Sequence, residues 1–430
     1  MPISQSMIAR VQEVVDMAAF EVFVTTVVAG AVFAFLLRRF NVTRVHPSLK
    51  GYQKLGTTGP SNLLDEYDSG YTIPQASQTI KDGAGWKVKA LLIHPIKSCA
   101  PVELSSAEVN GTGFVWDRKF AFAELLTPQA RRDAVDEAKK PQWTFRTQRT
   151  PGYEKLAHVR PEVWLRPRNN DSHVSTPQDG MLIVSYPYTP SGPFASFVKF
   201  FLPSFLLPSK SSFSVPLELP DNHDYPVERV TIWKDSPLWV NVGRHVPESF
   251  RLYLGAKNAL TLFRVDPNSP REVFRCAPRK EQLGYQANVG FADAYPVHLL
   301  NISSVHDIGE RVKEDIPRFS SRRFRPNILI QGPAAFNEDD WKIIRIGTHV
   351  FFCACHTVRC RLPNVDPDTG ARHPVEPDKT LKSFRCIDDG DPLNACLGLQ
   401  LVPAEGQVFQ VHVEDEVVVL ERGEHHYIKQ

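Results

Sequence analysis

Motifs that hold nucleotides or mark common hydrolases are absent from this sequence of 430 residues. No GxGxxG follows an expected strand, and GxxxxGK[ST], GxSxG and HExxH do not occur. The glycine loops that cradle phosphates, the serine elbow of many hydrolases and the paired histidines of many zinc proteases are therefore missing. Any catalytic site must be of another kind.

A strong net charge and a dense cysteine framework are also missing. The 50 basic and 48 acidic residues leave a net charge of +2, which argues against a nucleic-acid binder, because such proteins concentrate basic residues on one face. Seven cysteines are too few for a disulfide scaffold in a chain of this length, so a reducing compartment is expected. The 35 prolines favour loops and short strands over a helical bundle.

The N-terminal part carries a long apolar run, MAAFEVFVTTVVAGAVFAFLL, in which Glu21 is the one charged residue. About 20 apolar residues span a bilayer, so a single transmembrane anchor is predicted over residues 17–38, behind a tail of residues 1–16. Arg38 and Arg39 follow the run, which places the larger, C-terminal part in the cytosol. A cleaved signal peptide and a buried core helix are the alternatives.

Beyond a Gly/Ser/Thr/Pro-rich segment at 39–85, expected to be a linker, short apolar or alternating runs predict many strands. The expected fold is mainly β with some α, an α+β arrangement of barrels or sandwiches. Strands are expected at 86–93, 102–109, 114–125, 328–330 and 417–420, a hairpin around Gly347-Thr348, and helices at 247–254 and from Ser304 to about Asp315. Residues 186–225 hold seven prolines and an aromatic run, which predicts either a loop that covers the core or a segment on a membrane surface.

The segment from Phe324 to Arg385 is the strongest candidate for a site. Cys360 lies between Arg359 and Arg361, and cationic neighbours favour the thiolate, the form that binds a soft metal or attacks an electrophile. The turn Asp366–Gly370 follows, and such a turn would hold the cysteine on a surface loop.

Polar residues at the ends of other expected strands can be combined with this cysteine. They are Lys97 and Ser98, Arg118, and Arg325 and Asn327. Each could present a cation, a hydroxyl or an amide to an anion, although a solvated strand end explains any one of them alone. Together with a thiolate they suggest a pocket for a phosphorylated, metal-bearing ligand.

Two other chemistries use the same region. A zinc site would combine Cys353, Cys355, His356 and Cys360, but their spacing lacks a second ligand pair at a suitable distance. A nucleophilic Cys360 with His356 as base lacks an evident orienting residue. Cys353 and Cys355 fall on one face of an expected strand and are interpreted as small buried residues.

The motifs resemble a known family. HPIKSCAPVELSSAEVNGTGFVWDRKF resembles the start of the MOSC N-terminal β-barrel domain, and FRPNILI, W-x-x-x-x-IG, RC-x-x-x-x-VDPDTG and TLKSFR resemble the molybdenum-cofactor-binding MOSC domain. Both modules behind an anchor are similar to the mitochondrial amidoxime-reducing component. The resemblance implies two β-barrel-type domains, at 86–261 (with the insertion at 186–225) and 262–425.

The resemblance also implies roles for eight residues. Cys360 would be the catalytic residue and the protein ligand of molybdenum in a molybdopterin cofactor. Seven residues would bind the pterin and its phosphate or line the pocket: Lys97, Ser98, Arg118, Tyr295, Arg325, Asn327 and Arg359.

The implied reaction is two-electron reduction of N-hydroxylated compounds such as amidoximes. Electrons would come from a cytochrome b5-type haem protein and its NADH-dependent reductase, and no nucleic acid is involved. The implied location is the mitochondrial outer membrane, with the catalytic part facing the cytosol. The alternative is a membrane-tethered cofactor carrier or a pyridoxal-phosphate-linked sulfur-transfer module without reductase activity.

Overall fold

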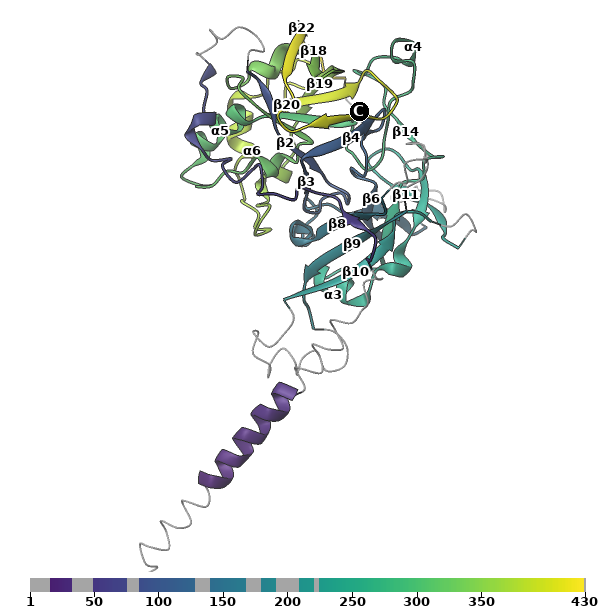
Figure 1. The fold of residues 1–430 in the computed structure, drawn as a ribbon, viewed down its shortest axis with the longest axis vertical. Coiled ribbons are helices and arrows are strands. Elements are labelled where there is room, and N and C mark those ends of the chain that lie inside the picture. Colours follow the sequence, from purple (N-terminus) through teal and green to yellow (C-terminus); the bar gives the residue numbers. More distant parts are fainter. Residues whose placement is uncertain are drawn as a thin grey trace, which may run out of the picture.

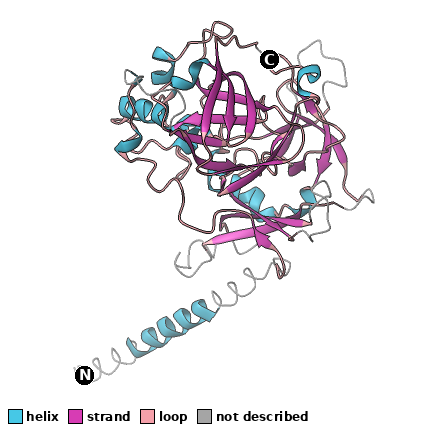
Figure 2. Cartoon of the chain, turned by 45° about the horizontal axis from the view of Figure 1, so that its top comes forward, coloured by secondary structure: helices cyan, strands magenta, loops and turns pink. Residues whose placement is uncertain are grey.

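The computed structural model describes residues 16–32, 49–75, 85–127, 140–167, 179–190, 209–219 and 224–428. The strands form two bodies, and the helices lie at the periphery of these bodies (Figures 1 and 2). The expectation of a mainly β chain with some α is therefore confirmed.

The first body contains a closed five-stranded barrel in the order β11-β12-β13-β6-β7. A four-stranded antiparallel sheet, β1-β8-β9-β10, packs against it through a core that includes Phe122, Val184 and Phe250. The strands are β1 Gln53–Lys54, β6 Phe120–Leu126, β7 Gln142–Phe145, β8 Arg160–Leu165, β9 Gly180–Pro187, β10 Lys210–Pro216, β11 Val227–Thr231, β12 Leu238–Asn241 and β13 Leu260–Arg264.

The second body is built on an eight-stranded sheet in the order β22-β18-β19-β20-β16-β17-β2-β3, together with the small sheets β21-β4-β5 and β14-β15. It is an open sheet of half-barrel form rather than a second closed barrel. Its strands are β2 Lys87–Ile93, β3 Val102–Leu104, β4 Ser106–Asn110, β5 Gly113–Phe114, β14 Arg271–Glu272, β15 Asn288–Val289, β16 Val297–Asn301, β17 Ile328–Gln331, β18 Trp341–Ile346, β19 His349–Val358, β20 Cys396–Pro403, β21 Phe409–His412 and β22 Val417–Arg422.

Both faces of this sheet are covered. One face packs on the apolar side chains of α5 and α6 and the other on the β4 and β21 strands, so neighbouring residues of β2 such as Leu91 and Leu92 enter different cores. This explains the continuous apolar run in β2. The α-helices of the two bodies are α3 Glu248–Leu254, α4 Lys280–Leu283, α5 Ile302–Val312 and α6 Asp378–Phe384. The 3₁₀ helices are η1 Ser69–Tyr71, η4 Glu154–His158, η6 Gly243–His245, η7 Ser321–Phe324, η8 Asn337–Asp340 and η9 Leu362–Asn364.

The strand β2 connects the two bodies. It pairs with β17 in the eight-stranded sheet, although it lies far earlier in the chain. Directly after β2, Ile96 bridges Phe120 of the barrel, and the Lys97 N–H donates to the Phe120 carbonyl at 2.8 Å. The segment that carries Lys97 and Ser98 is therefore fixed where the barrel meets the large sheet.

Several local expectations are confirmed. The helix α3 begins after Pro247 and ends at Gly255, which adopts φ +74°. Ile346 pairs with His349 across the two-residue turn that Gly347 begins, with φ +57°. The helix α5, in contrast, begins at Ile302 rather than near Ser304, because Asn301 caps it by accepting the Ser303 N–H.

The segment expected to be a linker contains structure over residues 49–75. Leu63 is buried in the core beneath α5, and Glu66 is 4% exposed. The Glu66 carboxylate accepts hydrogen bonds from the Ser320 and Ser321 hydroxyls, both at 2.8 Å. Residues 49–75 therefore form a strap that pairs with β8 of the first body through β1 and is bound to the second body through Leu63 and Glu66.

The apolar N-terminal run is helical over residues 16–32, and this helix lies apart from the β bodies (Figure 1). Its large apolar side chains are exposed, from 40% at Val24 to 67% at Phe20. Within the described residues no helix has both the length and the apolar character needed to cross a bilayer. The predicted positions 33–38 lie outside the described residues, as do 191–208 and 220–223 of the predicted insertion.

Candidate functional site

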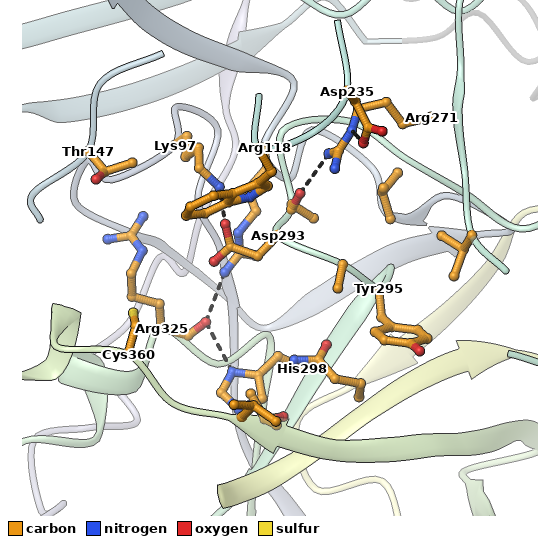
Figure 3. A pocket seen from close by; sticks show the side chains of 18 of the residues that line it. Lys97, Arg118, Thr147, Asp235, Arg271, Asp293, Tyr295, His298, Arg325 and Cys360 are labelled. Atoms are coloured by element: carbon orange, nitrogen blue, oxygen red, sulfur yellow. Dashed lines mark hydrogen bonds and ion pairs between the residues drawn. The ribbon is translucent and has the colours of Figure 1, made fainter. Parts of the chain in front are cut away.

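A cavity of about 1300 Å³ opens where the barrel and the eight-stranded sheet meet (Figure 3). The barrel contributes residues that follow β7 and β11, and the sheet contributes residues of β16, β19 and β20. All eight residues singled out in the sequence line this one cavity: Lys97, Ser98, Arg118, Tyr295, Arg325, Asn327, Arg359 and Cys360.

Cys360 lies just beyond the C-terminal end of β19 and is partly exposed. Its two arginine neighbours point to different places. Arg359 lines the cavity, whereas Arg361 is 65% exposed and donates to Asp378 at 3.1 Å. Of these two neighbours, Arg359 is therefore the one that adds positive charge to the cavity.

The loop after Cys360 is tied to the FRPN segment by ion pairs. Arg323 contacts Asp366 at 2.5 Å and Arg322 contacts Asp368 at 2.6 Å. The other Asp366 oxygen accepts the Thr369 N–H at 2.8 Å, which closes the turn. Two motifs that are distant in the sequence thus hold the cysteine loop against the segment that carries Arg325.

Three cavity residues adopt left-handed backbone conformations that side chains other than glycine rarely occupy. The φ angles are +65° at Ser98, +48° at Arg118 and +55° at Arg325. Local hydrogen bonds stabilise them: Gln148 donates to the Ser98 carbonyl at 2.7 Å, and the Arg118 N–H donates to the His94 carbonyl at 2.8 Å. Strained backbone conformations of this kind are common at functional sites, where they orient side chains.

Arg118 and Asn327 form the polar centre of the cavity wall. One Arg118 nitrogen donates to the Asn327 amide oxygen at 3.3 Å, and another donates to the Arg325 carbonyl at 3.0 Å (Figure 3). The Asn327 side-chain amide donates to the Leu92 carbonyl at 3.1 Å and accepts the backbone N–H of His298 at 3.1 Å. Its amide therefore fixes β2, β16 and Arg118 relative to one another.

Lys97 and Asp293 form an ion pair inside the cavity. The Lys97 ammonium donates to Asp293 at 2.5 Å and to the Phe291 carbonyl at 2.7 Å. Burial lowers the pKa of Lys97 to about 8, although Asp293 opposes this shift. The cavity wall partly desolvates the Asp293 carboxylate, but its side chain is 64% exposed, and the Lys97 ammonium holds the Asp293 pKa well below its usual range.

The affinity of the cofactor-free protein for a small anion is expected to fall as the pH rises. With a Lys97 pKa of about 8, the charged fraction drops about fourfold between pH 7 and pH 8.5. Titration with inorganic sulfate, whose charge is constant over this range, should show a fall of about that size. Lys97→Arg keeps the charge and should flatten the profile, so an equally steep profile in this variant would contradict the role of Lys97.

Two buried guanidinium groups have unused hydrogen-bond donors. Arg325 Nη2 and Arg359 Nε are buried and without a protein partner. Burial lowers the pKa of Arg325 to about 9 and that of Arg359 to about 10, so both carry charge at neutral pH. Burial also lowers the pKa of His298, and the neutral ring donates to the Arg325 carbonyl at 3.4 Å and accepts from Arg359 at 3.3 Å. These donors fit a bound phosphate, and the Cys360 thiol beside them fits a soft metal.

The alternative chemistries find little support in the geometry. Within the described ranges no three His, Cys, Asp or Glu side chains are grouped to hold a metal ion. Both ring nitrogens of His356 are engaged, with Asp388 at 2.7 Å and the Asp339 carbonyl at 2.9 Å. Cys353 and Cys355 are buried as expected, but an irregularity in β19 places them in two different cores rather than on one face.

Sequence reasoning did not single out several of the residues that line the cavity. Asp293 and His298 are two of them, and Arg149, Trp233, Asp235 and Arg271 are further examples. Arg149 stacks over Trp233 at 4.3 Å, and Arg271 donates to Asp235 at 2.7 Å and to two backbone carbonyls. No motif marks them. Arg149, Trp233 and Asp235 come from barrel loops, whereas Arg271 and His298 come from β14 and β16, and only the tertiary fold brings these segments together. Asp293, two residues before Tyr295, is the one that the sequence analysis could have included.

Two family models match parts of the chain. Residues 85–191 match the MOSC N-terminal beta barrel domain, and residues 286–418 match the MOSC domain. The chain is 24% identical over 304 residues to mitochondrial amidoxime-reducing component 1 of Mus musculus, covering 71% of this chain and 73% of that protein. It is 32% identical over 160 residues to the Danio rerio component 1, and 38% identical over 100 residues to component 2 of Rattus norvegicus. These two matches cover 46% and 29% of those relatives' lengths, and 36% and 23% of this chain.

Proposed function

We propose that this MOSC-domain protein is a molybdenum-cofactor-dependent oxidoreductase that reduces N-hydroxylated compounds, such as amidoximes and N-hydroxy bases, to the corresponding N–H compounds. The observation that carries the proposal is the convergence of Cys360 and seven cofactor-type residues on one cavity. Relatives named as amidoxime-reducing components support the reaction class.

The residues present fit a molybdopterin. Cys360 would supply the thiolate ligand to the metal, and Lys97, Ser98, Arg118 and Arg325 would hold the pterin and its phosphate by charge-assisted hydrogen bonds. When bound, the cofactor supplies the two-electron redox chemistry that the side chains lack. Asn327 and Arg359 orient the cationic wall, and Tyr295 closes the opposite side of the cavity (Figure 3).

The protein would work as the terminal member of an electron-transfer system. Single electrons would come from a cytochrome b5-type haem protein and its NADH-dependent reductase, since neither a nicotinamide nor a flavin motif occurs in the sequence. The exposed apolar helix at 16–32 would form part of an anchor in the mitochondrial outer membrane, with the catalytic part in the cytosol.

Metal analysis followed by an assay tests the proposal. Purified protein should contain about one molybdenum per chain, released together with a pterin on denaturation, and it should reduce benzamidoxime with a chemical one-electron donor. Bound cofactor without any reduction would instead support the carrier or sulfur-transfer alternative. Absence of both metal and pterin would contradict cofactor binding.

Removal of the apolar helix should not affect the cofactor. A chain that begins at residue 49 keeps the strap and loses the exposed apolar surface of residues 16–32, so it should be monodisperse without detergent and retain its molybdenum. A chain that begins at residue 76 is the matched comparison and should unfold at lower denaturant concentration, since it loses Leu63 and Glu66 from their buried sites. Loss of molybdenum from the well-folded longer chain would show that the N-terminal part does more than anchor.

A further inference from the structure

Two cysteines outside the proposed metal site share one small core. Cys276 lies in the loop after β14, and Cys355 lies in the middle of β19. Both pack in a cluster that also contains Tyr295 and Tyr427, two residues that line the large cavity. Two thiols from distant segments are thus brought together behind the cavity wall.

The surroundings of Cys276 favour its anion. Its sulfur accepts the Ile428 N–H at 3.3 Å and lies 3.6 Å from the His426 carbonyl oxygen, and Cys355 and Tyr295 pack beside it in the same core. The contact with Cys355, together with those with Tyr295 and the Ile428 N–H, lowers the pKa of Cys276 to about 6, so the thiolate dominates at neutral pH. Cys276 is partly exposed, so a small oxidant in solution can reach it.

Cys355 has the complementary properties. It is 0% exposed, and burial raises its pKa well above the usual value, so it remains a neutral thiol. A reactive thiolate beside a second cysteine is the arrangement in which the neighbour captures the first oxidation product, and the neighbour gives up its proton as it attacks. Cys99, Cys353 and Cys396 are buried with raised pKa values and are therefore protected from such a reaction.

We propose that Cys276 and Cys355 form an oxidisable dithiol, in which Cys276 reacts with hydroperoxides and Cys355 resolves the product as an intramolecular disulfide. The Cys276 thiolate attacks one peroxide oxygen, the O–O bond breaks, and the sulfur becomes a sulfenic acid while the peroxide is reduced to water. The Cys355 sulfur then attacks the sulfenic sulfur, an S–S bond forms, and water leaves with the Cys355 proton. In total, two thiols and one peroxide give one disulfide and two waters.

The position of the pair connects this reaction to the cavity. Tyr295 is 4% exposed, packs with both cysteines in the same core, and forms part of the cavity wall. The C-terminal residues His426 and Ile428 contact Cys276 through their backbones, and the Tyr427 N–H donates to Asp388 at 2.7 Å. Oxidation would therefore change a wall of the cavity without involving Cys360.

Thiol mapping of the full-length holoprotein tests this inference independently of activity. The protein is treated with equimolar hydrogen peroxide, the remaining thiols are alkylated, and peptides are analysed by mass spectrometry. Wild type should lose the Cys276 and Cys355 thiols together, give a linked peptide pair, and recover both thiols with dithiothreitol. Cys355→Ser should instead accumulate a sulfenic acid at Cys276 that dimedone traps, and Cys276→Ser should leave the Cys355 thiol free.

Cys386→Ser is the matched control, because Cys386 is also partly exposed and its thiol donates only to the Lys382 carbonyl, at 3.5 Å. This variant should form the Cys276–Cys355 disulfide as fast as wild type. The inference is overturned if both thiols stay alkylatable while Cys386 is oxidised. It is also overturned if wild type accumulates as much dimedone-trapped Cys276 as Cys355→Ser does.

Discussion

Replacement of Cys360 by alanine is expected to reduce amidoxime turnover by at least about 100-fold, more than the loss of a supporting partner costs at a metal site. Cys360 is the cavity-lining cysteine, and in the proposed function its thiolate makes the one direct protein bond to molybdenum. The measurements are steady-state turnover and molybdenum content of the purified variant. A variant that keeps its pterin but loses turnover would assign Cys360 to tuning the metal rather than to retention of the cofactor.

Cys353→Ala is the matched control. Cys353 is buried in the core of the eight-stranded sheet, and burial raises the pKa of its thiol. Its removal should lower the free energy of unfolding by about 1 kcal/mol and leave turnover per bound molybdenum unchanged. Equal activity of Cys360→Ala and wild type would disprove the assignment of the site.

Local signals in the sequence were sufficient to predict several elements of the fold. Pro247 and Gly255 mark the two ends of α3 by backbone preferences that do not depend on the rest of the chain. The hairpin at Gly347 follows from turn geometry in the same way. The start of α5 was misplaced, because both Asn301 and Ser304 are good N-cap residues. In the fold the Asn301 side chain accepts the Ser303 N–H, whereas the Ser304 hydroxyl donates to the distant Glu338.

The sequence was sufficient to select candidate residues for the cavity, but not to predict how their side chains are arranged in space. Strand ends carry polar side chains that the strand itself does not use, which is why Lys97, Arg118 and Arg325 stand out in the sequence. That Arg361 turns outward to Asp378 while Arg359 enters the cavity depends on long-range contacts. The separation of Cys353 from Cys355 depends on a register shift in β19, and alternation along one strand cannot reveal it.

The partners of Cys276 were beyond sequence reasoning for a related reason. It lies 79 positions before Cys355 and 152 before Ile428, so no spacing rule joins them. Asp293 illustrates the same limit, since its ion pair with Lys97 spans 196 positions. The Lys97–Asp293 contact exists because the segment after β2 meets the loop after β15 at the cavity. The contacts of Cys276 exist because the loop after β14 packs against β19 and the C-terminal residues.

Purified protein supplied with NADH alone is expected to reduce nothing, and the addition of cytochrome b5 and its reductase should start turnover of a simple aromatic amidoxime. The sequence has no nicotinamide or flavin motif, and in the proposed function electrons from NADH would pass through a partner that delivers them singly to the cavity. The measurement is NADH oxidation at fixed reductase, with cytochrome b5 omitted in the control.

The same assay tests how the partner docks. If the encounter is electrostatic and transient, turnover should fall several-fold as salt rises, because the Debye length shrinks from about 10 Å at 0.1 M to about 3 Å at 1 M ionic strength. Reduction by a small chemical donor needs no protein encounter, so it should change little over the same range, which separates docking from an effect of salt on the site. Turnover with NADH alone, or none with the complete chain and a loaded cofactor, would contradict the electron-transfer role and favour a carrier or sulfur-transfer function.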